Sequence, residues 1–198
     1  PVEVYAADFD GSKTMDAILC SYIMGESYPV VSRDRMLEQM TSLRKKFLRY
    51  ATYGRAKISD IFSKEILDKS YHLKSNIMSS VILWNNNNSF SIQLLPQDVQ
   101  KSMVKGSCVY DFNHDAKMDI ISCGNFYDTD IDVGIYDASI GNVLLNDGNK
   151  AFTSLNIAQS GFYVPGNVRT IKKISLGKKQ GFAVVENNGY VKLFSLNN

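Results

Sequence analysis

The stretch "VYDFNHDAKMDII" (Val109–Ile121) places an acidic or amide side chain at every second position and then one more aspartate, between two apolar runs. A single stretch of this kind is equally well explained by a solvated acidic turn. The same spacing recurs in "VYAADFDGSKTMDAIL" (Val4–Leu19), and a turn that only had to be polar would not need the same pattern twice. The repetition therefore predicts two related loops, each joining two strands.

Length and composition set outer limits on the function. The chain has 198 residues, of which 44% are hydrophobic, so it can bury a full core. A net charge of +2 gives no general attraction to nucleic acid or to an anionic membrane. No apolar run approaches the roughly 20 residues that span a bilayer. Because the chain begins inside a strand pattern, "PVEVYAADFDG", we expect it to be a piece of a longer protein.

Short apolar runs separated by Asn and Gly predict many short strands. Three segments are versions of one hairpin, in which an apolar strand, an Asn-rich turn and a second strand follow one another: residues 82–96, 143–157 and 183–197. An acidic loop flanked by strands precedes two of them, which makes four strands per repeat. Asn146 and Asn187 are 41 positions apart (187 − 146), within the roughly 40–45 residues of a propeller blade. The expected fold is mainly β, a partial β-propeller of about three four-stranded blades.

One segment breaks the strand pattern. Between Ser32 and Ser75, apolar residues recur at helical spacing, with Ser32 as a possible N-cap and Ser63 as the cap of a second helix over about 64–73. The predicted first blade consists of residues 1–31 and 76–96, and residues 32–75 form a helical insertion carried outside its sheet. The second blade is predicted at residues 97–160. The third is predicted at residues 161–198, at the end of a larger propeller.

The acidic loops and Asn-rich hairpins resemble the FG-GAP or VCBS repeats of integrin-type β-propellers. The segments "SYPVVSRDRMLEQMTSLRKKF", "DIFSKE", "CGNFY", "YDASIGNVLL" and "SGFYVPGNVR" are similar to one bacterial branch of these proteins, over nearly the whole chain. The resemblance implies a binding or scaffold module of a larger extracytoplasmic protein, in the periplasm, outer membrane or cell surface. It implies a protein or polysaccharide ligand, and a parent chain that completes the propeller.

In that family the loop binds calcium, and its pattern of nine positions is Asp, any, Asp or Asn, any, Asp or Asn, Gly, any, any, Asp. Calcium is a hard cation that takes six to eight oxygen ligands. The resemblance assigns four side chains and one backbone carbonyl in each loop: Asp8, Asp10, Ser12, Asp16 and the Thr14 carbonyl, then Asp111, Asn113, Asp115, Asp119 and the Lys117 carbonyl. Ser12 replaces a charged or amide ligand, so we expect weaker binding in the first loop. Lys13 and Ala116 replace the family's glycine, which commonly serves a positive-φ turn, at a cost of roughly 1 kcal/mol.

Other functions stay open at this point. An EF-hand is excluded, because its twelfth position needs a bidentate Glu, and Leu19 and Ser122 stand there. No catalytic residue is predicted from the sequence. An alternative function is a carbohydrate-active or other hydrolytic enzyme with a site on a propeller rim, because the chain has enough carboxylates for one. A further alternative is a protein-interaction arm that uses the helical insertion as its contact surface.

Overall fold

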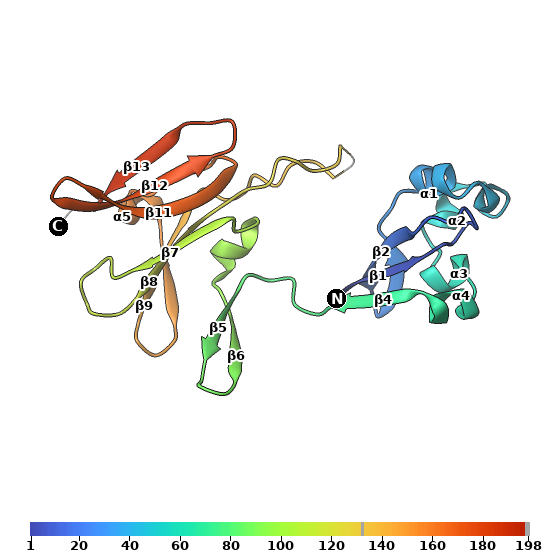
Figure 1. The fold of residues 1–198 in the computed structure, drawn as a ribbon, viewed down its shortest axis with the longest axis horizontal. Helices are drawn as coiled ribbons and strands as arrows, with labels where there is room; N and C mark the ends of the chain where they lie inside the picture. The colour runs from blue at the N-terminus through green and yellow to red at the C-terminus, as the bar shows by residue number, and fades with distance from the viewer. Residues whose placement is uncertain (132, 197–198) are drawn as a thin grey trace. The chain divides into compact units, whose positions relative to one another are not determined.

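The computed structural model describes residues 1–131 and 133–196. Its fold is mainly β, with four antiparallel sheets, none of them closed, so the predicted fold class is confirmed at that level. The chain forms two compact units, Pro1–Met78 and Ser79–Asn198, and most of their helices and strands are labelled in Figure 1. Among the described residues, no helix is both long enough and apolar enough to cross a membrane.

The first unit is built on a four-stranded sheet with the strand order β3-β2-β1-β4. Its strands are β1 (Val2–Ala7), β2 (Asp16–Ile23), β3 (Glu26–Pro29) and β4 (Tyr71–Ser75). The first acidic loop joins β1 to β2, and Ala7 pairs with Asp16 where the two strands meet it. The loop therefore lies at one end of the two central strands.

Short helices cover one face of this sheet: α1 (Arg33–Gln39), the 3-10 helix η1 (Thr41–Lys45), α2 (Tyr50–Tyr53), α3 (Ile58–Ile61) and α4 (Lys64–Lys69). Met36, Met40 and Phe47 are buried in one cluster with Ile18 and Cys20 of β2. The helices α1–α4 lie outside the strands of the sheet, as predicted, and this segment supplies most of the buried core of the unit.

The end of the helical segment also differs from the prediction. Ser63 caps α4 by accepting a hydrogen bond from the Ile66 backbone N–H, as expected, although α4 ends at Lys69. The residues predicted to continue the helix to about position 73 instead begin β4, which pairs with β1 from Val2 to Ala6. Pairing with an open sheet edge satisfies the backbone groups of this segment, which outweighs its helical pattern.

The second unit contains a four-stranded sheet that follows the chain order. Its strands are β7 (Gly106–Tyr110), β8 (Asp119–Cys123), β9 (Asn142–Asn146) and β10 (Phe152–Leu155), preceded by the 3-10 helix η2 (Gln97–Lys101) and followed by α5 (Ile157–Ser160). The second acidic loop joins β7 to β8, where Tyr110 pairs with Asp119. Both acidic loops thus connect neighbouring antiparallel strands, as predicted.

A three-stranded sheet, β11 (Val168–Leu176), β12 (Lys179–Glu186) and β13 (Val191–Ser195), packs against this sheet. Ile121 and Val143 from the first sheet share one buried cluster with Ile171, Phe182 and Val184 from the second. The two sheets therefore bury apolar faces against each other, which gives the second unit its core.

The hairpin of β5 (Val81–Asn85) and β6 (Phe90–Leu94) forms a two-stranded sheet of its own. It belongs to the second unit, where the Trp84 ring stacks on Phe152 with 6.4 Å between ring centroids. The predicted first blade joined this hairpin to residues 1–31, but the fourth strand of that sheet is β4. All three Asn-rich hairpins are present, with positive φ at Asn87, Lys150 and Asn188 in their turns.

The three cysteines carry free thiols. Cys20 and Cys123 are buried in strands β2 and β8, and Cys108 is half-buried in β7. Burial raises the pKa of Cys20 to about 11 and that of Cys123 to about 12. These two thiols are therefore protonated at neutral pH and play a packing role.

Candidate metal centre

The first acidic loop is folded around its own side chains. Four of its backbone N–H groups donate to them: Phe9 to Asp16 Oδ2 (3.1 Å), Ser12 to Asp10 Oδ1 (2.9 Å), Lys13 to Asp8 Oδ2 (2.9 Å) and Thr14 to Ser12 Oγ (3.3 Å). These bonds turn the carboxylates toward the inside of the turn. The loop forms this way because short Asp and Ser side chains readily accept from the backbone N–H two residues ahead.

The second acidic loop repeats the arrangement at the same four positions. Its backbone N–H groups donate from Phe112 to Asp119 Oδ2 (2.9 Å), from Asp115 to Asn113 Oδ1 (3.2 Å), from Ala116 to Asp111 Oδ2 (2.9 Å) and from Lys117 to Asp115 Oδ1 (2.9 Å). Thr14 and Lys117, the predicted carbonyl ligands, therefore occupy equivalent positions. The repeat seen in the sequence is thus a repeat in conformation.

Both loops also turn through the left-handed region at the same two positions. Gly11 and Lys13 have φ of 78° and 67° in the first loop, and His114 and Ala116 have 60° and 65° in the second. Lys13 and Ala116 stand where the resembled pattern has glycine, so the expectation of a positive-φ turn at that position is confirmed. Both side chains are held in a conformation that L-residues disfavour.

The last aspartate of each loop is buried, unlike the others. Asp16 and Asp119 are 3% and 0% exposed. Besides its own loop, Asp16 accepts from Gln39 Nε2 at 2.5 Å, and Asp119 accepts from the Asn146 backbone N–H at 2.8 Å. Each carboxylate therefore ties its loop to a neighbouring element, a role that the sequence did not reveal because Gln39 and Asn146 are distant along the chain.

The first loop brings three carboxylates together. One oxygen from each of Asp8, Asp10 and Asp16 lies within 4.8 Å of the others. Hydrogen bonds from the Ser12 side chain and backbone N–H hold the pKa of Asp10 below its ordinary value, so this group is ionised at neutral pH. Three carboxylates at this spacing repel one another, and their oxygen-only donor set fits a hard divalent cation such as calcium.

The second loop holds its acidic and amide side chains in a different arrangement from the first. The Asp115 carboxylate accepts from Asn113 Nδ2 at 3.1 Å and lies 3.5 Å from the Lys117 ammonium. The pKa of Asp115 is lowered, chiefly by the hydrogen bond from the Lys117 backbone N–H. Within residues 1–131 and 133–196, a trio of carboxylates within 4.8 Å is found in the first loop alone. The predicted order of calcium affinity, with weaker binding in the first loop, stays a prediction.

A further acidic stretch, "YDTDIDVGIYDAS", follows β8. Asp128 forms an ion pair with Arg169, with 2.6 Å between Oδ2 and Nη2. Asp132 lies outside the described residues. The stretch is thus held partly by a basic residue of β11, and its described acids form no trio of potential metal ligands.

Comparison with protein-family models, with curated proteins and with solved structures finds no match. Family and function are therefore inferred from the residues and geometry of this chain.

Proposed function

We propose that the chain is a calcium-stabilised segment of an FG-GAP/VCBS-type β-propeller, acting as a binding or scaffold module of a larger extracytoplasmic protein. The observation that carries the proposal is the pair of acidic loops, 103 positions apart (111 − 8). They share four backbone-to-side-chain hydrogen bonds and two left-handed positions. An acidic turn with no specific task needs neither feature.

The sheets support the blade interpretation. Each acidic loop connects two neighbouring strands of a four-stranded antiparallel sheet. The β7–β10 sheet follows the chain order, and β11–β13 covers one of its faces, as stacked blades do. The first unit departs from this pattern, because its fourth strand, β4, lies beside β1 instead of β3.

Calcium would have a structural role at these loops. The oxygens of Asp8, Asp10, Ser12 and Asp16 would hold it in the first loop, and those of Asp111, Asn113, Asp115 and Asp119 in the second. A divalent charge offsets the repulsion among the carboxylates of the loop. Since an ion bound only by the folded state stabilises that state by mass action, calcium would raise the melting temperature.

Isothermal titration calorimetry of the calcium-stripped protein tests this role. We expect two calcium sites, with Asp10→Asn losing the site in the first loop and Asp115→Asn losing the site in the second. Asp34→Asn is a matched control, because Asp34 lies on α1 in an exposed pair with Arg33, and it should bind calcium like the unmodified protein. An absence of calcium heat, or unchanged binding in both loop variants, would refute the proposal.

A further inference from the structure

Glu3 of β1 has a completely buried carboxylate. It accepts hydrogen bonds from all four strands of its sheet: from Tyr5 OH (3.4 Å), Tyr22 OH (3.0 Å), Ser27 Oγ and His72 Nε2 (2.8 Å). Burial pushes the pKa of Glu3 up, but the bonds from Ser27, His72 and Tyr22 outweigh it and leave the pKa below its ordinary value. A buried carboxylate needs such partners, and here they fix the side chains around it.

His72 is the partner that reaches the surface. Its Nε2 is engaged by Glu3, and its ring lies flat on Tyr5, with 4.3 Å between centroids and 4° between planes. Its side chain is 43% exposed. When the imidazole is neutral and Nε2 carries the proton, Nδ1 keeps a free lone pair as an acceptor. Glu3 thus holds a rigid pair of rings with a polar edge.

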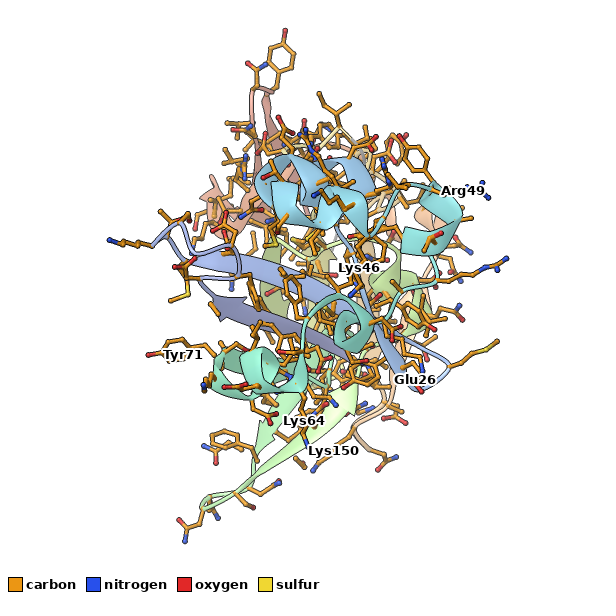
Figure 2. The ribbon with its side chains drawn as sticks, turned by 90° about the vertical axis from the view of Figure 1, so that its right-hand side faces the viewer. Glu26, Lys46, Arg49, Lys64, Tyr71 and Lys150 are labelled. Carbon is orange, nitrogen blue, oxygen red and sulfur yellow. The ribbon has the colours of Figure 1, made fainter. Side chains whose placement is uncertain are left out.

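These two rings line one side of a cavity of about 670 Å³ in the first unit, which opens widely to solvent and is lined by exposed and half-buried residues. The remaining lining comes from the helical segment and the residue before β4: Ser59, Lys64, Leu67, Asp68 and Ser70. Lys64, where α4 begins, and Tyr71, where β4 begins, are labelled in Figure 2. The volume lies within the roughly 300–1,000 Å³ of small-ligand sites.

The chemistry of the lining narrows the class of ligand. Lys64 and Asp68 contribute one charge of each sign, and neither forms an ion pair within the described part of the chain, so the lining has no net preference for a charged ligand. The hydroxyls, the ammonium and the carboxylate together offer both donors and acceptors. Leu67 and the two rings add an apolar surface. A metal ion would need three close ligands, which the described residues provide in the first acidic loop and not here.

We propose that this cavity binds a neutral sugar unit of an oligosaccharide or polysaccharide. A sugar ring has an apolar face, which would lie against Leu67 and the parts of the two rings that their stacking leaves uncovered. Its hydroxyls would bond to Asp68, Lys64 and His72 Nδ1. This inference names a ligand class for the proposed binding role. It does not depend on calcium, because no cavity residue belongs to the acidic loops.

The test is a titration of the ¹⁵N-labelled chain, followed by NMR, with neutral hexasaccharides of β-1,4-glucose, α-1,4-glucose, xylose and mannose. At least one should shift the amides of Tyr5 and residues 59–72. Asp68→Asn should weaken that binding about tenfold, as expected for losing a hydrogen bond to a charged group. Glu65→Gln on the same helix is the matched control, because Glu65 pairs with Lys69 at the exposed surface and does not line the cavity.

Three results would overturn the inference: no shift with any neutral hexasaccharide, shifts confined to other residues, or equal affinity in the Asp68 and Glu65 variants. Tighter binding of hexagalacturonate than of every neutral sugar would overturn the neutral class. The titration is run with calcium and with a chelator. If calcium binds but no sugar does, this inference is contradicted. If a sugar binds but calcium does not, the proposed function is contradicted.

Discussion

At the scale of single residues, the aspartates of each acidic loop have two different tasks. Asp16 and Asp119 are buried and hold the loop closed through backbone N–H groups. Asp8 and Asp10 are exposed and available to an ion. The sequence predicted all of them as ligands, and its spacing did not show that Asp16 and Asp119 are buried and also anchor their loops.

Asp119→Ala should therefore destabilise the second unit even without calcium. The substitution removes the acceptor of the Phe112 and Asn146 backbone N–H groups, at a cost of about 2–4 kcal/mol in the free energy of unfolding. Urea unfolding in the presence of a chelator measures it. Asp115→Ala, in the exposed part of the same loop, should lower the free energy of unfolding clearly less. Equal decreases in the two variants would show that Asp119 has no anchoring role.

Glu3 predicts an acid dependence of stability. Its folded pKa is depressed, so it contributes stability that is fully present above the pKa of the unfolded chain and is lost as pH falls through the lower folded value. Glu3→Gln should be less stable at neutral pH and should lose less stability on acidification to about pH 3. Urea midpoints across this range measure the effect. Parallel pH profiles for the two proteins would contradict it.

At the scale of elements, local patterns were predictable and long-range pairing was not. The three hairpins and the two acidic loops follow from short spacings and turn residues such as Asn87 and Asn188. The helical stripe of Met36, Met40 and Phe47 was predictable from its spacing, but the spacing did not show that this stripe forms the core of the first unit. The strand β4 was missed because its partner β1 lies about 70 positions earlier, as in the pairing of Tyr5 with His72.

The loop turn gives a test at the level of one element. Ala116 has φ of 65°, a conformation that glycine adopts without strain, so Ala116→Gly should stabilise the calcium-free protein by about 1 kcal/mol. Ala183→Gly in β12 is the control and should destabilise it by about 0.5–1 kcal/mol, because glycine weakens a strand. Denaturant unfolding measures both. Destabilisation by Ala116→Gly would refute the loop conformation.

The helical segment gives a second test. Met40 is 1% exposed in the core of the first unit, so Met40→Ala should cost about 2–5 kcal/mol. Ile66 on α4 is 40% exposed, and Ile66→Ala should cost less than about 1 kcal/mol. Chemical denaturation followed by NMR measures the unfolding of each unit separately. A loss below about 1 kcal/mol in Met40→Ala would show that the helical segment is not part of the core of the first unit.

At the scale of the whole molecule, the sheets leave apolar surface open. Leu19, Val4 and Leu73 stand in one row across β2, β1 and β4, and Leu19 and Leu73 are 47% and 68% exposed. On the hairpin, Leu83 and Ile92 are paired and exposed on one face. Stacked blades cover surfaces of this kind. The proposal that the parent chain supplies further blades accounts for them.

The most direct test of the central claim is a crystal structure of the protein grown in calcium, with the anomalous signal of the ion measured. The account predicts an ion in the first loop, with oxygens of Asp8, Asp10 and Asp16 at about 2.3–2.6 Å, and one at the equivalent place among Asp111, Asn113, Asp115 and Asp119. The loop backbone should keep its two left-handed positions. Calcium-free loops in such crystals would contradict the account.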